Sequence, residues 1–357
     1  MKKTVLFDRH KELNAKIVEF AGYMMPISYT SVNEEHIHVR NKVGIFDVSH
    51  MGEFEISGSN SIEFVQYLCS NDISKINVGN AQYNCMTNES GGIIDDLIVY
   101  RLNIDKYLFV VNASNISKNW EWIKNNNKKF NCSISNLSDD ISLLAIQGPY
   151  AESLCQKFTN EKLSLLKNYS FIECKFAGFK DILVSKTGYT GSGGYEIYLP
   201  NKNALKIWDI LFSDKEYDLR PIGLAARDTL RIEMGYCLYG NDINEDTSPV
   251  EANLKWITKT DTNFIGSKNI VKQINSGIKR NLVGFKLNER SVPRNGYNIY
   301  NLDKKLIGEV TSGTFSPILK IGIGLAYIDS KYIDNKIILV KIRDKFIKAT
   351  IAKTPFI

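Results

Sequence analysis

The chain has 357 residues, of which 43% are hydrophobic and 24% are charged. These values are typical of a globular protein with sizeable cores, and the length predicts two or three domains. The formal net charge of +6 is mild, which favours an acidic small molecule or an acidic protein as the partner over a nucleic acid.

The six cysteines are scattered along the chain without a C-x-x-C pair, so we expect reduced thiols and no zinc site. The N-terminal stretch becomes charged before an apolar segment of signal-peptide length develops. No apolar run approaches the length of a membrane span. Together these features predict a cytoplasmic protein.

In the N-terminal part, residues 21–26 combine turn residues with large apolar side chains and predict an exposed loop. Ser31 and Glu34 have capping-box spacing, which predicts a helix from there to about Val43. Residues 45–56 predict a strand, a bend and a second, alternating strand, and a short helix follows.

The next segment contains the most informative stretch, two adjacent carboxylates inside a run of β-formers. Strands over 80–86 and 93–102 form a hairpin around Gly91 and Gly92. Neighbouring side chains of a strand point to opposite faces, so Asp95 and Asp96 cannot both face the interior. An interior carboxylate needs partners or a task, which suggests a pocket acid. The alternative is that both acids cap a turn at the end of the strand.

After this hairpin, strands and helices alternate up to about residue 234. A strand over 107–112 leads into a helix at about 114–124, and the polar tract 125–129 predicts a solvated loop. The remaining expected elements are strands at 143–147, 181–185 and 195–199, a helix that begins near Pro149, and helices at 204–212 and 224–234.

The C-terminal part changes in composition near residues 275–277. Beyond that point short strands are separated by turn residues with almost no helical period, which predicts a small antiparallel barrel or sandwich. We therefore expect an α+β body over 1–275 and an all-β domain over 276–357. The body is expected to contain two interleaved subdomains, roughly 1–50 with 140–275, and 51–139.

The glycine-rich segment 187–194 lies between two predicted strands. It lacks the Lys-Ser/Thr ending of a P-loop and leads into a strand, so no helix N-terminus is available to bind a phosphate. A tight backbone beside a ligand fits better, with Tyr189 and Glu196 facing a pocket. An ordinary hairpin is the alternative.

The histidines and cysteines show no catalytic or metal-binding spacing, and no G-x-S-x-G motif is present. On the helix at 224–234, Arg227 and Arg231 share a face at i,i+4. They act either as a clamp for a planar carboxylate or as partners of internal acids such as Asp228 and Glu233.

Taken together, these stretches resemble the aminomethyltransferase (T-protein) family of the glycine cleavage system. The matching motifs run in family order over essentially the whole chain, which makes the set specific. They lie at 20–26, 44–51, 91–100, 147–149, 187–196, 223–230, 238–240 and 311–317.

The resemblance implies a three-lobed cloverleaf fold with folate in a central cavity and the all-β domain as the last lobe. It implies transfer of the aminomethyl group from the lipoyl arm of the H-protein to tetrahydrofolate as co-substrate. Ammonia, 5,10-methylenetetrahydrofolate and the dihydrolipoyl H-protein are the products. Neither a metal nor a flavin is implied.

By position in the motifs, the essential acid of the family corresponds to Asp96. Glu196 corresponds to the residue that hydrogen-bonds the amino–amide edge of the pterin, and Arg227 to the arginine at the folate site. The resemblance also places the following residues around the cavity: Tyr83, Asn112, Tyr189 and Met51.

The chain departs from the family pattern at two places. Family members commonly continue past the Pro-Phe-aromatic ending with an arginine that reaches the folate, whereas this sequence stops at Ile357. This difference predicts weaker or rearranged binding of the glutamyl tail. The usual tryptophan before the Met-Pro loop is Tyr23, which keeps an aromatic ring.

Two other functions are compatible with parts of the pattern. One is the folate module that accompanies N-methylglycine-type oxidases, but a flavin fingerprint is missing. The other is a non-catalytic folate-binding protein related to iron–sulfur assembly factors. Cys237 partly matches the cysteine-containing motif of those proteins. The residues around Cys237 follow the transferase pattern, and Asp96 favours catalysis.

Overall fold

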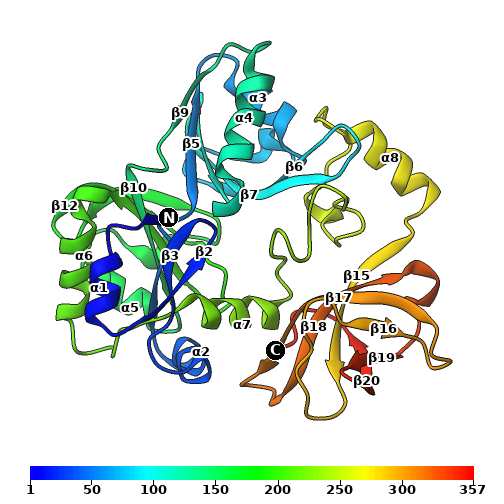
Figure 1. The fold of residues 1–357 in the computed structure, drawn as a ribbon. Helices are drawn as coiled ribbons and strands as arrows, with labels where there is room; N and C mark the ends of the chain where they lie inside the picture. Colours follow the sequence, from blue (N-terminus) through cyan, green and yellow to red (C-terminus); the bar gives the residue numbers. More distant parts are fainter. The chain divides into compact units, whose positions relative to one another are not determined.

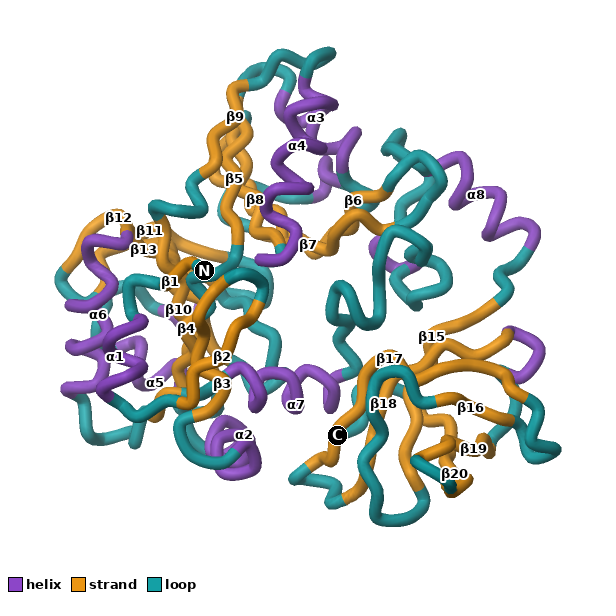
Figure 2. The backbone as a smooth tube through the Cα atoms, in the orientation of Figure 1, coloured by secondary structure: helices purple, strands orange, loops and turns teal.

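The computed structural model describes residues 1–357, and its backbone contacts separate two units. The first unit comprises Met1–Val65, Ser74–Tyr83 and Leu97–Asp228. The second comprises Gln66–Ile73, Asn84–Asp96 and Thr229–Ile357. The chain therefore crosses between the units several times, and both are mixtures of helices and strands (Figure 1, Figure 2).

A small three-stranded sheet opens the first unit, in the order β1-β3-β2 with helix α1 between β1 and β2. The predicted exposed loop at residues 21–26 is wrong, because Tyr23–Ser28 forms β3 and Tyr23, Met25 and Pro26 are buried. Antiparallel pairing with β2 decides this, and the turn before β3 is made by Ala21 and Gly22 at positive φ. The bounds are β1 Lys2–Lys3, α1 Phe7–Glu12, β2 Lys16–Phe20 and β3 Tyr23–Ser28.

A six-stranded sheet forms the main core of the first unit, in the order β11-β12-β13-β10-β4-β14. Its apolar side chains pack with Leu154 of α5 and Trp208 of α6. Most of its strands were predicted. The bounds are β4 Gly44–Asp47, β10 Ile141–Gln147, α5 Ala151–Gln156, β11 Phe171–Phe176, β12 Phe179–Ser185, β13 Gly194–Pro200, α6 Asn201–Ser213 and β14 Arg220–Pro221.

Helix α2 (Val32–Asn41) begins with the predicted capping box. The Glu34 amide donates to Ser31 Oγ at 3.3 Å, and the Ser31 amide donates to the Glu34 carboxylate at 3.4 Å. This prediction is therefore confirmed. The reason is local, because the two residues satisfy each other's backbone donors without help from the rest of the fold.

A five-stranded sheet has the order β6-β7-β8-β5-β9, and the division between the units runs through β6 and β7. The hairpin of β6 and β7 was predicted. The polar tract 125–129 was predicted as a loop, but its first three residues belong to α4, which ends at Asn127. Near this end, Asn126 Nδ2 donates a hydrogen bond to Trp122 O at 2.9 Å. The bounds are β5 Gly52–Ser57, α3 Ser61–Leu68, β6 Ala81–Thr87, β7 Ile93–Asn103, β8 Lys106–Val111, α4 Ile116–Asn127 and β9 Ser133–Asn136.

The C-terminal part forms a closed barrel in the order β15-β18-β17-β16-β19-β20 (Figure 1). This confirms the predicted barrel, whose interior is filled by side chains such as Phe285, Val310 and Ile338. The three-residue strand β16 was missed because it is too short to show an alternating pattern. The bounds are β15 Arg280–Leu287, β16 Asn298–Tyr300, β17 Leu306–Ser316, β18 Ile321–Asp329, β19 Ile337–Ile342 and β20 Lys345–Ala352.

Two further helices complete the fold. Helix α7 (Leu224–Met234) runs from the first unit into the second, as the division after Asp228 shows. Helix α8 (Ser267–Ser276), which was not predicted, ends at Gly277, where the composition of the sequence changes. None of the helices combines the length and the apolar character needed to cross a membrane.

Candidate functional site

The two adjacent acids of β7 point to opposite faces, as the strand alternation predicts. Asp95 is fully buried, whereas Asp96 is partly exposed. The fully buried carboxyl of the pair is therefore Asp95, whereas Asp96, to which the family resemblance assigns the essential acid, is half-buried. Partial exposure suits an acid that must reach a ligand.

The glycine pair before β7 is required by a close approach of the chain. A Cβ atom at Gly92 would lie 1.7 Å from the Glu245 carbonyl oxygen. The Ile93 amide donates to Asn244 O at 3.1 Å and Thr247 O at 2.9 Å. The turn is thus clamped under the segment 244–247 of the same unit, and this contact holds the start of β7 and its two acids in place.

Asp96 acts electrostatically on three groups of the second unit. Burial raises the pKa of the Cys85 and Cys237 thiols, and the charge of Asp96 adds to both rises. Burial also raises the pKa of the Tyr239 phenol, with smaller additions from nearby acids that include Asp96. These neighbours therefore stay uncharged at neutral pH. A carboxylate beside uncharged thiol and phenol groups can stabilise a cation that forms next to it.

A second group of predicted residues meets within the first unit, on β13, α7 and the glycine-rich loop. The Arg227 guanidinium lies 4.8 Å from the centre of the Tyr189 ring. Burial lowers the pKa of Arg227, and the charge of Glu196 opposes this shift. The Arg227 Nη1 atom is buried and has no hydrogen-bond partner. A buried guanidinium nitrogen without a hydrogen-bond partner destabilises the protein. Such a nitrogen indicates a binding site in which an acceptor atom of a ligand completes the hydrogen bond.

The Glu196 carboxylate lies at the end of a chain of hydrogen-bonded hydroxyl groups. Its Oε2 atom accepts a hydrogen bond from Thr187 Oγ1 at 2.5 Å. Thr187 Oγ1 also lies 3.2 Å from the Tyr100 hydroxyl, which is 3.0 Å from that of Tyr198. Burial raises the pKa of both tyrosines, and the charge of Glu196 adds to the rise. The carboxylate is thus oriented by neutral donors, so its charge remains available to a ligand.

The glycine-rich loop joins the antiparallel strands β12 and β13 and is held by side-chain hydrogen bonds. Thr190 Oγ1 donates to Gln147 Oε1 at 2.8 Å, and Arg40 Nη1 donates to Thr190 O at 2.5 Å. A Cβ atom at Gly188 would lie 2.1 Å from Gln147 Oε1. The loop therefore needs glycine to pack on Gln147, and this packing positions Tyr189 next to Arg227.

The other predicted lining residues are all partly exposed. Gly52 of β5 pairs with Val111 of β8, and Met51 and Asn112 are their respective sequence neighbours at this end of the two strands. Tyr83 lies in β6. Six of the seven predicted site residues thus belong to the first unit, whereas Asp96 belongs to the second.

Arg231 differs from Arg227 although the two share a helix face. Arg231 is 1% exposed, and its Nη1 atom lies 2.8 Å from Asp242 Oδ2. Its Nη2 atom donates to Ser312 Oγ of the barrel at 2.8 Å. Arg231 therefore joins α7 to the barrel. Asp242 lies eleven positions after Arg231 and outside the helix, so the helical pattern of the sequence could not indicate this pair.

A buried hydrogen-bond network around Asp47 was also missed by the sequence analysis. Asp47 Oδ2 lies 2.8 Å from His10 Nε2 and accepts from Thr4 Oγ1 at 2.7 Å, while His10 Nδ1 lies 2.8 Å from the Tyr29 hydroxyl. Burial alone would raise the pKa of Asp47, but hydrogen bonding, first of all to His10, brings it below its ordinary value. The network ties the N-terminal segment to β4, and the separation of 37 positions between His10 and Asp47 left no local signal.

The histidines are packed into the protein, and each of the four is at most 7% exposed. No group of three or more His, Cys, Asp or Glu side chains is placed to hold a metal ion. The side chains of the two groups can carry out acid–base, hydrogen-bonding and electrostatic chemistry.

Comparison with known proteins covers the whole chain. Residues 6–262 match the family model described as the GCVT N-terminal domain. Residues 280–357 match the model described as the glycine cleavage T-protein C-terminal barrel domain.

Curated relatives and a solved structure agree with these models. An aminomethyltransferase of Flavobacterium psychrophilum is 51% identical over 359 residues, covering 100% of this chain and 99% of the relative. One of Phocaeicola vulgatus is 48% identical over 360 residues, with the same coverage. The crystal structure of glycine cleavage system aminomethyltransferase T from Bartonella henselae superposes with a TM-score of 0.93 at 31% identity, covering 100% of this chain and 98% of that one.

Proposed function

The chain belongs to the glycine cleavage aminomethyltransferase (T-protein) family, and we propose that it transfers the aminomethyl carbon from the lipoyl arm of the H-protein to tetrahydrofolate. Ammonia and 5,10-methylenetetrahydrofolate are released, and the lipoyl arm is left as the dithiol. The membership rests on identity over the full length, so it covers both family domains. The activity of an aminomethyltransferase follows from the same relationship.

The observation that carries the folate assignment is the buried, unpartnered Nη1 atom of Arg227 beside Tyr189. A folate brings hydrogen-bond acceptors and a carboxylate, either of which satisfies this nitrogen. Glu196, oriented by Thr187, accepts hydrogen bonds from the amino–amide edge of the pterin. Met51, Asn112 and Tyr83 line the same site in this proposal.

Asp96 has the role of the catalytic acid in this proposal. The carbon leaves sulfur as a methylene iminium ion when the C–S bond breaks, and a folate nitrogen then attacks it. Ammonia leaves as the second folate nitrogen closes the ring. Asp96 holds the reacting nitrogens, stabilises the cation and accepts the proton released on attack. Its uncharged neighbours, Cys85, Cys237 and Tyr239, support the electrostatic part of this role.

The decisive experiment follows ammonia release from aminomethyl-loaded H-protein and tetrahydrofolate, with wild type compared with Asp96→Asn. Proton transfer and charge stabilisation are each worth about 100-fold or more in rate, so we expect a loss of at least that size. Asp140→Asn, which changes an exposed acid, is the matched control and should keep wild-type turnover. Near-normal turnover by a folded Asp96→Asn protein would exclude the proposed role.

The alternative of a non-catalytic folate-binding protein is not favoured, because the full-length relatives are aminomethyltransferases. A wild-type protein that binds tetrahydrofolate but releases no ammonia would revive it. A cytoplasmic location belongs to the proposal and is tested by cell fractionation.

A further inference from the structure

Helix α2 makes polar contacts with two segments that carry residues of the proposed folate site. Its residues Glu35 and Arg40 are five positions apart, which places their side chains about 140° apart around the helix axis. Glu35 is 3% exposed, and Arg40 is half-buried. The two side chains therefore reach different parts of the first unit, to which α2 belongs.

Glu35 binds the residue that precedes α7. Its Oε2 atom accepts a hydrogen bond from the Gly223 amide at 2.7 Å. The Gly223 carbonyl in turn accepts a hydrogen bond from the Arg227 amide at 3.3 Å, which closes the first turn of α7. Figure 2 shows α2 below the start of α7. A path of two hydrogen bonds therefore leads from Glu35 to the backbone of Arg227.

The Glu35 carboxylate is itself fixed in place. Its Oε1 atom accepts hydrogen bonds from the amides of Tyr29 at 2.6 Å and Thr30 at 2.8 Å. Gly223 lies so close to the preceding strand that a Cβ there would be 2.3 Å from the Ile27 carbonyl oxygen. A carboxylate bound by three backbone amides at the N-terminus of a helix is favourable, because its charge strengthens each bond and opposes the helix dipole.

Arg40 binds the glycine-rich loop. Its Nη1 atom donates to Thr190 O at 2.5 Å and to Ser192 Oγ at 2.6 Å. Thr190 directly follows Tyr189, whose ring centre lies 4.8 Å from the Arg227 guanidinium. The contact of Arg40 therefore limits where Tyr189 can lie.

Helix α2 is packed closely against the core of the first unit. Val39 is fully buried, and a Cβ at Gly44 of β4 would lie 2.8 Å from its Cγ2 atom. The Lys42 carbonyl at the end of the helix accepts a hydrogen bond from the Tyr150 amide at 3.2 Å. A Cβ at Gly148 would lie 2.2 Å from the same carbonyl oxygen. These close contacts oppose a shift of α2 relative to the six-stranded sheet.

We propose that α2 is a brace that sets the position of the Arg227 guanidinium against the Tyr189 ring, with Glu35 and Arg40 as positioning residues. This inference rests on the proposed function, in which Nη1 of Arg227 binds an acceptor atom of the folate. A group that is fixed before the ligand arrives binds it with a smaller loss of conformational freedom. A misplacement of about 1 Å can cost a site about 100-fold in rate.

Glu35→Gln tests the contact with α7. An amide has one acceptor oxygen, so if that oxygen keeps the amides of Tyr29 and Thr30, the amide nitrogen faces the Gly223 amide and their bond is lost. The size of the side chain is unchanged. We expect the KM for tetrahydrofolate to rise about tenfold, with kcat within about twofold of wild type. Glu34→Gln, which removes a charge from an exposed position of the same helix, is the control and should change this KM less than about twofold.

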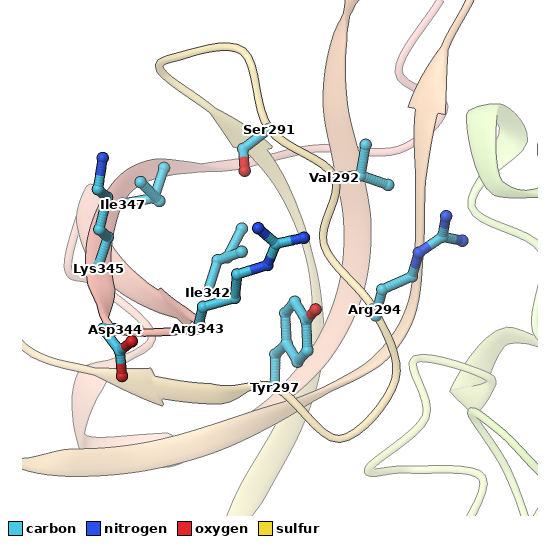
Figure 3. Close-up of a pocket in the computed structure, with 9 residues that line it drawn as sticks. All are labelled: Ser291, Val292, Arg294, Tyr297, Ile342, Arg343, Asp344, Lys345 and Ile347. Carbon is cyan, nitrogen blue, oxygen red and sulfur yellow. The ribbon is translucent and has the colours of Figure 1, made fainter.

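Arg40→Met tests the contact with the loop and should also raise the KM for tetrahydrofolate about tenfold. The loss of a positive charge could by itself weaken binding of an anionic ligand. Arg343→Met is therefore the matched control. Arg343 is exposed and lines a surface hollow of about 600 Å³ in the barrel, which belongs to the second unit (Figure 3). Both variants lose one positive charge, but only Arg40→Met should change the KM.

Double-mutant cycles separate positioning from a general loss of structure. Glu35→Gln should raise the KM less than about twofold in an Arg227→Met background, because the group that Glu35 positions is then absent. Arg40→Met should likewise have less than about a twofold effect in a Tyr189→Leu background. Equal factors in the variant and wild-type backgrounds, or an unchanged KM in either single variant, would overturn the inference.

A measurement without substrate separates the inference from the proposed function. The ring current of Tyr189 shifts the NMR signal of the Arg227 Nε–H group, which is assigned by its absence from Arg227→Met. In the free protein, Glu35→Gln and Arg40→Met should move this signal towards its position in Tyr189→Leu, whereas the control variants should not. An unmoved signal would refute the positioning role. If wild type shows no turnover but the signal moves as expected, the proposed function fails and the positioning role stands.

Discussion

Replacing Glu53 by Gln should change how the stability of the protein depends on pH. Glu53 lies on β5, is fully buried, and neither of its carboxyl oxygens has a hydrogen-bond partner. Burial raises the pKa of this carboxyl well above its ordinary value of 4.5. The folded protein therefore keeps a proton that the unfolded chain releases above pH 4.5.

This difference makes folding weaker as the pH rises. A single proton held only by the folded state lowers the free energy of unfolding by about 1.4 kcal/mol per pH unit. The loss begins above the ordinary pKa of Glu and continues until the pH reaches the raised pKa of Glu53.

His50 acts in the opposite direction at lower pH. Burial lowers its pKa from 6.5 to about 4, so the unfolded chain binds a proton between these values that the folded protein does not. Stability due to His50 therefore rises by about 1.4 kcal/mol per unit from pH 4 to 6.5. The contributions of Glu53 and His50 therefore have opposite signs above pH 4.5, and that of His50 ends at about pH 6.5.

The assay is urea unfolding at pH 5.5, 6.5, 7.25 and 8.0, followed by tryptophan fluorescence. Relative to wild type, Glu53→Gln should gain stability as the pH rises above 4.5, by about 1.4 kcal/mol per pH unit for as long as the folded protein keeps the Glu53 proton. Glu55→Gln is the control, because Glu55 on the same strand is partly exposed and lies 2.8 Å from Lys106. Parallel pH profiles of wild type and Glu53→Gln would refute the reasoning.

Three other substitutions test the site and its support. Arg227→Met removes a charged hydrogen-bond donor worth about 1.5–3 kcal/mol and should raise the KM for tetrahydrofolate about 10- to 100-fold; an unchanged KM would exclude Arg227 from the folate site. Gly92→Ala forces a Cβ onto the Glu245 carbonyl, 1.7 Å away, and should cost about 1–3 kcal/mol in a thermal melt, whereas wild-type stability would mean that the turn can open. Arg231→Met leaves Asp242 buried without its cation, a loss of about 3–5 kcal/mol that should lower the Tm by about 6–20 °C; a smaller shift would argue that Asp242 is adequately held by its other donors.

Local signals in the sequence predicted many elements because those elements are stabilised locally. The capping box of α2 satisfies its own donors, and β7 is a run of β-forming residues that follows a glycine turn. The opposite directions of Asp95 and Asp96 follow from the two-residue period of any strand. The boundary between the body and the barrel, as drawn at residue 275, stays a prediction.

Elements stabilised by distant partners were missed or misjudged. Tyr23–Ser28 looked like a loop, but pairing with β2 makes it a strand. The sequence pattern did not distinguish Arg227 from Arg231 on their helix face. The structure does, because Arg231 forms an ion pair with Asp242. Glu53 carried no signal of its burial, because its environment comes from other parts of the fold.

The sequence by itself determined the strand with its two acids, the glycine-rich loop, the C-terminal β pattern and, through its motifs, the family. These depend on periodicities and spacings within a few residues. Only the tertiary structure decided which acid is half-buried and which arginine nitrogen lacks a partner. Burial and hydrogen bonding depend on residues far apart in the chain, so no local pattern encodes them.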